Sequence, residues 1–449
     1  MNKLMNKRVA FLSLGCKVNA YETEAIKEQF LSYGCIPVDF KEEADVYVVN
    51  TCTVTNIADK KSRQMLRRAK TINPDAVVVA VGCYVQESAD LISEEKLADL
   101  LVGNRLKASV ARFTEEYLEK TEEDGKRIIC YTGGDMEDYE DMSFLSDYSH
   151  KRVDVKIQDG CGQFCSYCII PYARGRICSR NTESILSEIK SLADKGFKEV
   201  ILTGIHVSSF GLDDVSRKEQ LNLVRDDGRM PLAELIESIN EIEGIKRIRL
   251  SSLEPRIITR EFVSRLFECE KLMPHFHLSL QSGSDTVLRR MNRKYDTARY
   301  LEACDILREY YYRPSITTDI IVGFPGETEE EYLETEAFAR KADFARIHIF
   351  PYSKREGTAA ARMDGQLSAE EKAERAKRLS SVEEELRKNY EESLVGEQRT
   401  VLVESVSEEE GRRMCHGFTP EYVKLSFEND MAEPGDIIEL TVDSVFVDI

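Results

Sequence analysis

Three cysteines lie within eight residues in the stretch "DGCGQFCSYCIIPYARGR", residues 159–176: Cys161, Cys165 and Cys168. A structural zinc site usually takes four protein ligands, commonly from paired C-x2-C elements, and no partner pair follows this run. Iron–sulfur clusters are instead held by cysteine thiolates, usually one per iron. The C-x3-C-x2-C spacing therefore predicts a 4Fe–4S cluster with one iron left open, and zinc binding or unligated thiols are the alternatives.

An open iron can accept a chelating ligand such as the amine and carboxylate of S-adenosylmethionine. An electron from the cluster could then cleave the sulfonium and generate a radical, while the protein orients the cofactor. The cysteines follow the stretch "VDVKIQDG", which places them at the carboxyl end of the first predicted barrel strand, the functional face of α/β barrels. Tyr167, beside Cys168, is expected to shield the site or flank the adenine, or else simply to pack.

A second set of cysteines is spread along the first hundred residues. Cys16, Cys52 and Cys83 end the predicted strands "SLGC", "VNTC" and "AVGC". The carboxyl ends of parallel strands lie at one edge of a sheet, where such folds build sites. We expect these thiols to converge on a second three-cysteine cluster, and the alternative is three buried thiols. The polar residues expected to hydrogen-bond this site are Asn19, Asn50 and Thr51.

Elements that alternate between strand and helix would position both cysteine sets. In the first hundred residues, strands are predicted at 8–16, 44–52 and 76–84, with helices at 19–34 and 57–72 between them. Strand–helix–strand repetition at this spacing implies a parallel sheet with right-handed crossovers.

A second strand–helix series begins near residue 151. Its further predicted strands cover 199–205, 247–253, 275–283, 315–325 and 344–353. Six strand–helix repeats predict a complete or partial α/β barrel. A charged helical segment at 367–394 follows, and after Gly396 the pattern changes to short β-rich runs. These runs predict a small five-stranded barrel or sandwich, a type that often binds RNA.

The net charge of −19 over 449 residues argues against a general nucleic-acid binder. The charge is uneven, however, because residues 59–70 carry six basic residues and one acid, and residues 289–299 carry five and one. These runs could form basic faces on an acidic protein, or ordinary solvated helix faces. No apolar run approaches the ~20 residues of a membrane helix, and no signal peptide is recognisable, so a cytoplasmic protein is expected. The six other cysteines are expected to be small buried hydrophobes.

Taken together, the two three-cysteine sets, the C-x3-C-x2-C run and the β-rich tail resemble the radical S-adenosylmethionine methylthiotransferases. Further matching stretches are "LTGIHVSSFG" (202–211), "RLSSLEP" (249–255), "LSLQSGSD" (278–285) and "TDIIVGFPGET" (318–328). The resemblance implies a methylthiotransferase domain at 1–118, an acidic linker at 119–146, a radical barrel at 147–376 and a TRAM domain at 377–449. The implied fold class is α/β: a parallel sheet domain, a partial (β/α)6 barrel and a small β-barrel.

The resemblance also implies two 4Fe–4S clusters and S-adenosylmethionine as cofactors. It assigns Cys161, Cys165 and Cys168 to the radical cluster, and it assigns Cys16, Cys52 and Cys83 to an auxiliary cluster that handles the inserted sulfur. The residues expected to contact S-adenosylmethionine are Tyr167, Gly204, Ser251, Gln281 and Asp319.

Finer detail favours one branch of the family. The stretch "GCKVNAYETE" at 15–24 is similar to the branch that acts on threonylcarbamoyladenosine in tRNA, although Ala20 replaces a more usual Gln. The implied reaction replaces C–H by C–SCH3 at C2 of that adenosine, next to the anticodon. The implied partners are the tRNA anticodon loop, an electron donor and a sulfur source. The alternatives are isopentenyladenosine in tRNA, an aspartate of a ribosomal protein, or a non-enzymatic RNA-binding protein. Arg174 and Arg176 are expected to meet RNA phosphate or a substrate carboxylate, or to form a structural salt bridge.

Overall fold

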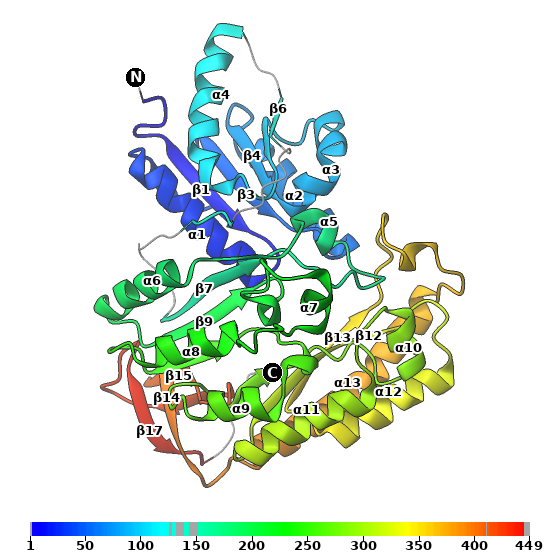
Figure 1. The fold of residues 1–449 in the computed structure, drawn as a ribbon. Coiled ribbons are helices and arrows are strands. Elements are labelled where there is room, and N and C mark those ends of the chain that lie inside the picture. The colour runs from blue at the N-terminus through cyan, green and yellow to red at the C-terminus, as the bar shows by residue number, and fades with distance from the viewer. Residues whose placement is uncertain (1, 125–127, 132–138, 143–150, 410, 444–449) are drawn as a thin grey trace. The chain divides into compact units, whose positions relative to one another are not determined.

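The computed structural model describes the whole chain except residues 1, 125–127, 132–138, 143–150, 410 and 444–449 (Figure 1). The chain divides into two compact units. The first unit comprises residues 1–146, 156–184 and 353–361. The second comprises residues 147–155, 185–352 and 362–449.

A parallel sheet with strand order β2-β1-β3-β4-β5-β6 is the centre of the first unit. Its strands are β1 (Arg8–Ser13), β2 (Ile36–Val38), β3 (Val46–Thr51), β4 (Val77–Gly82), β5 (Leu100–Val102) and β6 (Ile129–Tyr131). Its helices are α1 (Lys17–Ser32), α2 (Asn56–Ile72), α3 (Cys83–Glu94), the short helix η1 (Lys107–Ser109) and α4 (Val110–Asp124).

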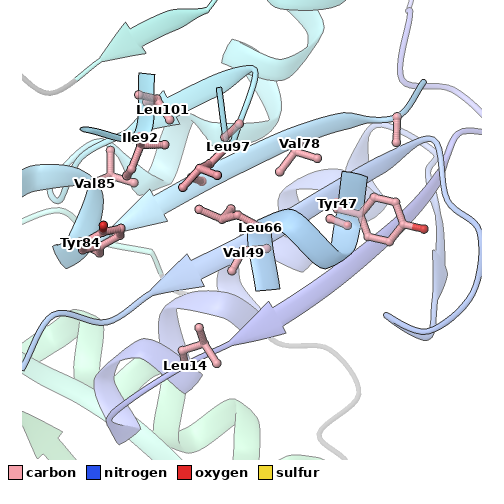
Figure 2. Packing of buried hydrophobic residues seen from close by; sticks show 14 of the residues in the cluster. Leu14, Tyr47, Val49, Leu66, Val78, Tyr84, Val85, Ile92, Leu97 and Leu101 are labelled. Carbon is pink, nitrogen blue, oxygen red and sulfur yellow. The ribbon is translucent and has the colours of Figure 1, made fainter. Parts of the chain in front are cut away.

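The core of this sheet explains why the strands form where they do. Every residue of β3 and β4 is buried, as expected for parallel strands covered on both faces, and both strands are rich in valine. Side chains of β3 and β4 such as Val49 and Val78 pack against helix residues such as Leu66 and Ile92 (Figure 2). A sheet fixed in this way holds its strand ends in a defined register.

Two later segments complete the first unit. One begins in the second half of β7 (Arg152–Asp159), continues through α5 (Ile170–Arg174) and pairs back antiparallel through β8 (Cys178–Ser179). The other is residues 353–361, and it leads into the short helix η4 (Ala360–Arg362).

The second unit is a partial barrel of strands. The order β10-β9-β7-β8 forms one sheet and β11-β12-β13 another, and a parallel bridge from Leu253 to Leu278 joins them. Its strands are β9 (Glu199–Gly204), β10 (Arg247–Leu250), β11 (His275–His277), β12 (Ser315–Val322) and β13 (Arg346–Pro351). Its helices are α6 (Thr182–Asp194), η2 (Val207–Ser209), α7 (Arg217–Asn222), α8 (Pro231–Asn240), η3 (Pro255–Ile257), α9 (Arg260–Phe267), α10 (Asp285–Arg290), α11 (Thr297–Tyr310), α12 (Glu329–Ala342) and α13 (Ala369–Glu392).

The carboxyl-terminal part of the second unit is an antiparallel sheet with order β16-β15-β14-β17. Its strands are β14 (Gln398–Glu409), β15 (Arg412–Phe418), β16 (Lys424–Glu428) and β17 (Ile437–Thr441). Two buried arginines of β10 attach this sheet to the barrel strands. Arg249 donates to the carbonyls of Thr419 and Pro420 at 2.7 Å each, and Arg247 donates to that of Phe418 at 2.8 Å.

The fold class predicted from sequence is confirmed: a parallel α/β sheet, a partial α/β barrel and a small curled antiparallel sheet. The tail shows four strands in its described part, and residues 444–449, where the predicted pattern continues, lie outside it. The predicted linker at 119–146 lies partly outside the described residues, and β6 falls within it. The predicted boundary at 376/377 falls inside α13.

Candidate functional site

The first cysteine set lies in the loop between β7 and α5. Gly160 enters this loop at φ +70°, and a Cβ atom there would stand 1.7 Å from the carbonyl oxygen of Arg176, so only glycine fits. The backbone N–H of Cys161 donates to Gly175 at 3.1 Å, and that of Cys168 donates to Cys165 at 3.0 Å. The loop is therefore closed on itself by its own backbone.

The three cysteines of this loop are partly exposed. Cys161, Cys165 and Cys168 are half-buried and reduced, and this donor set of three thiols suits an iron–sulfur cluster with an open iron. Around them, Phe164 and Tyr172 are exposed and meet edge-on, with ring centroids 5.7 Å apart.

Tyr167 is half-buried in the same loop. The carbonyl of its neighbour Ser166 accepts from Ala360 at 2.7 Å, so residues 353–361 also support the loop.

The second cysteine set lies at the carboxyl ends of three adjacent strands. Cys16 precedes α1, Cys52 follows β3 directly, and Cys83 is the first residue of α3 after β4. A Cβ atom on Gly15 would lie 2.6 Å from the sulfur of Cys52, so glycine allows two of these strand ends to approach. The placement at one sheet edge follows the expectation from the sequence.

The three thiols influence one another electrostatically. The pKa of Cys52 is raised to about 11, mainly by burial, and the nearby thiols of Cys83 and Cys16 contribute to the rise. A neutral, desolvated thiol is the resting form of such a group, and ionisation needs a nearby positive charge or a metal. The structure thus brings Cys16, Cys52 and Cys83 into one neighbourhood.

The polar residues predicted beside these cysteines hold the strand ends. Asn19 donates to the carbonyls of Leu14 at 2.7 Å and Thr51 at 3.0 Å, and Asn50 donates to that of Asn19 at 2.9 Å. The hydroxyl of Thr51 donates to Val81 at 2.6 Å. These side chains therefore fix the backbone that carries the cysteines.

A buried ion network lies beside the second cysteine set. Arg174 pairs with Glu22 at 2.9 Å and with Asp159 at 3.1 Å, and Lys156 pairs with the same two carboxylates at 2.7 and 2.6 Å. Lys107 also pairs with Glu22. Burial alone raises the pKa of Glu22, but these three cations outweigh it and hold that pKa well below its usual range. Desolvation also raises the pKa of Asp159, and Arg174 and Lys156 again lower it.

Arg174 forms a structural salt bridge, which is one of the roles expected from the sequence. Its side chain is 1% exposed, so the suggestion that it meets RNA phosphate is wrong. Arg176 is exposed, and its carbonyl accepts from Arg105 at 2.6 Å. Sequence reasoning missed the network, although one signal was present: Lys156 and Asp159 are charged residues in the strand that leads directly into the first cysteine set.

A second buried arginine supports the loop after Cys52. Arg355 donates to the hydroxyl of Thr53 at 2.6 Å and to the side chain of Asn56 at 3.1 Å, and it pairs with Asp59. Residues 353–361 thus pack within the first unit beside the loop that follows Cys52.

Four of the five predicted cofactor contacts belong to the second unit, and Tyr167 belongs to the first. Gly204 ends β9, Ser251 follows β10, and Asp319 lies in β12. Gln281 has φ +73°, and its N–H donates to the carbonyl of Asp319 at 2.8 Å. The hydroxyl oxygen of Ser251 is buried and has no hydrogen-bond partner among the described residues, so it is suited to bind a polar ligand.

His277 was not predicted from the sequence. Its Nε2 lies 3.2 Å from the carboxylate of Asp319, and its Nδ1 lies 2.9 Å from the hydroxyl of Thr317. This contact fixes the orientation of the Asp319 carboxylate at its strand position. The alternation of polar and apolar residues in "HFHLSL" is the signal that could have indicated it.

Within the described residues, no three or more His, Cys, Asp or Glu side chains converge on a point where a single metal ion could bind. A cubane cluster distributes its thiolate ligands over several irons, so it does not need such convergence. Over the same described range, no helix is long and apolar enough to cross a membrane.

Comparison with known proteins gives matches over nearly the whole chain. Residues 155–339 match the family model described as Radical SAM superfamily, and residues 8–103 match that described as Uncharacterized protein family UPF0004. The chain is 40% identical to the Threonylcarbamoyladenosine tRNA methylthiotransferase MtaB of Bacillus subtilis (strain 168), over 97% of this chain and 93% of that protein. It is 32% identical to the tRNA-2-methylthio-N(6)-dimethylallyladenosine synthase of Clostridium tetani, over 95% and 92% of the two chains.

Among solved structures, the radical S-adenosylmethionine methyltransferase TsrM of Kitasatospora setae resembles the chain with a TM-score of 0.56 and 12% identity. The likeness covers 77% of this chain and 73% of TsrM. At this identity the likeness establishes the fold alone.

Proposed function

Because the chain belongs to the radical S-adenosylmethionine methylthiotransferase family, we propose that it adds a 2-methylthio group to N6-threonylcarbamoyladenosine in tRNA, next to the anticodon. The observation that carries this choice is the 40% identity to a threonylcarbamoyladenosine enzyme, compared with 32% to a dimethylallyladenosine synthase, each across nearly the full chain. The stretch "GCKVNAYETE" favours the same substrate. The alternative is a methylthiotransferase acting on isopentenyladenosine in tRNA or on a ribosomal-protein aspartate.

The proposed cofactors are S-adenosylmethionine and two 4Fe–4S clusters. The residues that would hold the radical cluster are Cys161, Cys165 and Cys168, and those that would hold the second are Cys16, Cys52 and Cys83. When bound, the radical cluster and S-adenosylmethionine supply a 5′-deoxyadenosyl radical, which can activate a C–H bond that is too weakly acidic for acid–base catalysis.

The protein's own residues have positioning roles in this proposal. Gly160 and the backbone hydrogen bonds of the 161–168 loop fix the three thiols at a strand end. In the second unit, Ser251 offers a buried hydroxyl, and the His277 contact holds the Asp319 carboxylate in place. The residues proposed to bind S-adenosylmethionine are Tyr167, Gly204, Ser251, Gln281 and Asp319.

The target base must leave the anticodon-loop stack before its C2 atom can react, as enzymes that modify bases require. Exposed aromatic side chains such as Phe164 and Tyr172 can stack on unpaired bases. Exposed cations on α2, including Lys60, Lys61 and Arg68, can contact phosphates without reading sequence. We propose that the C-terminal sheet also contacts the RNA. We further propose that an unidentified electron donor and an unidentified sulfur source are partners of the protein, and that the protein acts in the cytoplasm.

The decisive experiment is nucleoside analysis of tRNA. Total tRNA from a strain lacking this chain is digested and examined by mass spectrometry, alongside tRNA from the same strain expressing the wild-type chain. The expected result is loss of 2-methylthio-N6-threonylcarbamoyladenosine and its return on complementation. If that nucleoside persists and the isopentenyl counterpart disappears, the alternative tRNA substrate is correct. If neither tRNA nucleoside changes, the tRNA assignment fails.

A further inference from the structure

The side chain of Arg174 has a defined partner at each nitrogen. Its Nη1 donates to Glu22 at 2.9 Å and to Asp159 at 3.1 Å. Its Nη2 donates to the side-chain oxygen of Asn19 at 2.7 Å and to Glu22 at 3.1 Å. Its Nε donates to the sulfur of Cys83 at 3.3 Å. The guanidinium therefore points one N–H at a cysteine of the second set while its other donors are used elsewhere.

A second donor reaches the same sulfur. The Nδ2 of Asn104, which follows β5, lies 3.4 Å from the sulfur of Cys83. The same amide nitrogen donates to the carbonyl of Ala173 at 2.7 Å, one residue before Arg174. Cys83 thus receives one charged and one neutral N–H, and both are tied to the α5 segment that follows the first cysteine set.

The ion network around Arg174 is unbalanced in charge. Its directly paired members are three cations and two carboxylates, which leaves a net charge of 3 − 2 = +1. Their side chains are all 9% exposed or less. Glu140 lies near the two lysines, but it is half-buried and its carboxylate accepts from the backbone N–H of Ala108 at 2.8 Å. The members of the network are Glu22, Lys107, Lys156, Asp159 and Arg174.

A buried guanidinium is costly in the low-dielectric interior, so a nearby negative charge stabilises it. A cysteine that ligates iron is a thiolate and carries such a charge. The sulfur of Cys83 is the contact of Arg174 that can provide it. The network therefore has the sign and the geometry to complement a cluster-bound Cys83.

We propose that Arg174, assisted by Asn104, is a positioning residue for the second cluster that holds the Cys83 sulfur by N–H···S hydrogen bonds and raises that cluster's reduction potential. This inference rests on the proposed function, because it requires a cluster at Cys16, Cys52 and Cys83. Hydrogen bonds to cluster sulfurs and nearby positive charge stabilise the more negative, reduced state, so they make reduction easier. This role of Arg174 is inferred from contacts within this chain. It concerns the reduction potential of the second cluster and not which type of cluster is bound.

The test measures the midpoint potential of the second cluster alone. The full-length chain carrying Cys161→Ala, Cys165→Ala and Cys168→Ala is reconstituted anaerobically, and its redox titration is followed by electron paramagnetic resonance, with iron counted for every sample. Arg174→Gln is expected to keep about four irons and to shift the midpoint to a more negative potential. Arg174→Lys is expected to shift the midpoint potential less, because lysine keeps the positive charge but lacks the planar set of N–H donors of the guanidinium group. Asn104→Leu is expected to shift it in the same direction by the smallest amount.

The matched control is Arg105→Lys. Arg105 donates to the carbonyls of Arg174 at 3.1 Å and Arg176 at 2.6 Å, so the change disturbs the same loop and leaves the Cys83 contacts in place. Its midpoint is expected to match that of the parent. An Arg174→Gln sample with full iron and the parent midpoint overturns the inference.

The remaining outcomes are also decisive. If Arg174→Gln does not load iron, the midpoint potential of Arg174→Lys tests the inference instead. If Arg174→Lys does not load iron either, the midpoint potential of Asn104→Leu tests it. In either case a midpoint equal to that of the parent overturns the inference. The two proposals fail in different ways. A parent that binds no iron at all contradicts the second cluster of the proposed function, whereas a loaded parent with unshifted variants contradicts only the role of Arg174 and Asn104.

Discussion

Gly15 lies directly against Cys52: a Cβ atom on Gly15 would stand 2.6 Å from the sulfur of Cys52 and 2.7 Å from its Cβ. The glycine also has φ +97°, a conformation that L side chains rarely adopt. Two strand ends of the parallel sheet can therefore bring their cysteines together only because this position has no side chain.

Gly15→Ala is predicted to displace Cys52 and remove iron from the second cysteine set while the 161–168 loop keeps its own. Iron analysis of the reconstituted chain is expected to fall from about eight to about four irons. Gly34→Ala is the matched control, because Gly34 also has a positive φ of +77° but its nearest neighbour is the side chain of Met5 at 3.7 Å. Both variants lose a similar backbone stability of about 1–2 kcal/mol. Equal iron in the two variants would contradict the prediction.

Cys165→Ala and Cys52→Ala are predicted to separate the two cysteine sets by function. Cys165→Ala should abolish S-adenosylmethionine cleavage, because the radical cluster loses a ligand. Cys52→Ala should retain cleavage and lose sulfur insertion. The measurements are 5′-deoxyadenosine by chromatography and the methylthiolated nucleoside by mass spectrometry. Full methylthiolation by Cys52→Ala would show that the second set is only structural.

Ser251→Ala is predicted to weaken S-adenosylmethionine binding about fivefold to tenfold, the effect of losing one hydrogen bond worth about 1 kcal/mol. Its buried hydroxyl has no partner among the described residues, so the unliganded fold should not be destabilised. Equilibrium dialysis of the reconstituted chain measures the affinity. Ser238→Ala on α8 is the control, because that exposed hydroxyl donates to Glu234 at 2.8 Å and lies in a helix. If Ser251→Ala binds S-adenosylmethionine with unchanged affinity, Ser251 does not contact this cofactor.

Tyr172→Ala is predicted to weaken tRNA binding about tenfold or more, since one base–aromatic stack is worth about 1–3 kcal/mol. Tyr172 is 57% exposed beside the first cysteine set, so its removal should leave the iron content unchanged. Filter binding with the unmodified tRNA measures the effect. Tyr312→Ala is the control, because it removes a still more exposed tyrosine, 70% exposed, two residues after the end of α11 in the second unit. If both changes reduce affinity equally, stacking at Tyr172 is not specific.

Glu331→Gln is predicted to lower stability at neutral pH by about 1 kcal/mol and to lose this effect in acid. The hydrogen bond from Arg290 lowers the pKa of Glu331 to about 2. A lowered pKa means that the carboxylate stabilises the fold above its ordinary pKa near 4.5, and that this contribution fades as the pH falls toward 2. Melting temperatures of the two proteins should therefore converge as the pH falls from about 4.5 toward about 2.

The matched control for that prediction is Glu371→Gln. Glu371 occupies the same capping-box position at the start of α13 that Glu331 occupies in α12, and glutamine can replace glutamate in this motif. Within the described structure Glu371 forms no ion pair. Its substitution should change the melting temperature less, and an equal change in both variants would assign the effect to the cap instead of the Arg290 pair.

Much of the architecture could be predicted because strands and helices have distinct hydrophobic periods. The valine-rich runs that became β3 and β4 were recognisable, and each led directly to a cysteine, so the convergence of Cys52 and Cys83 followed from parallel pairing. Short strands such as β2 and β5 were not predicted, because three residues carry too little periodicity.

The details of the site were harder to predict because they depend on partners far away in sequence. Arg174 was read as a group at the site mouth, since its local sequence shows only a second arginine nearby. Its burial is decided by Glu22, which lies 152 residues earlier on α1. Similarly, nothing local to Arg355 indicates that it binds Thr53, 302 residues away. The local hydrophobic pattern therefore predicts the helices and strands, whereas the ion pairs of the site depend on residues that are distant in the sequence.

The contacts of Arg355 have a consequence for synthesis of the chain. The first unit needs residues 1–146, 156–184 and 353–361, so its last part leaves the ribosome 177 residues after Ser184. At about 5–20 residues per second, this interval is roughly 10–35 s. During that time the nascent parallel sheet and both cysteine sets exist without the segment that later packs beside Cys52. The region that carries both cysteine sets can therefore reach its final form only after about four-fifths of the chain, through residue 361 of 449, has been translated.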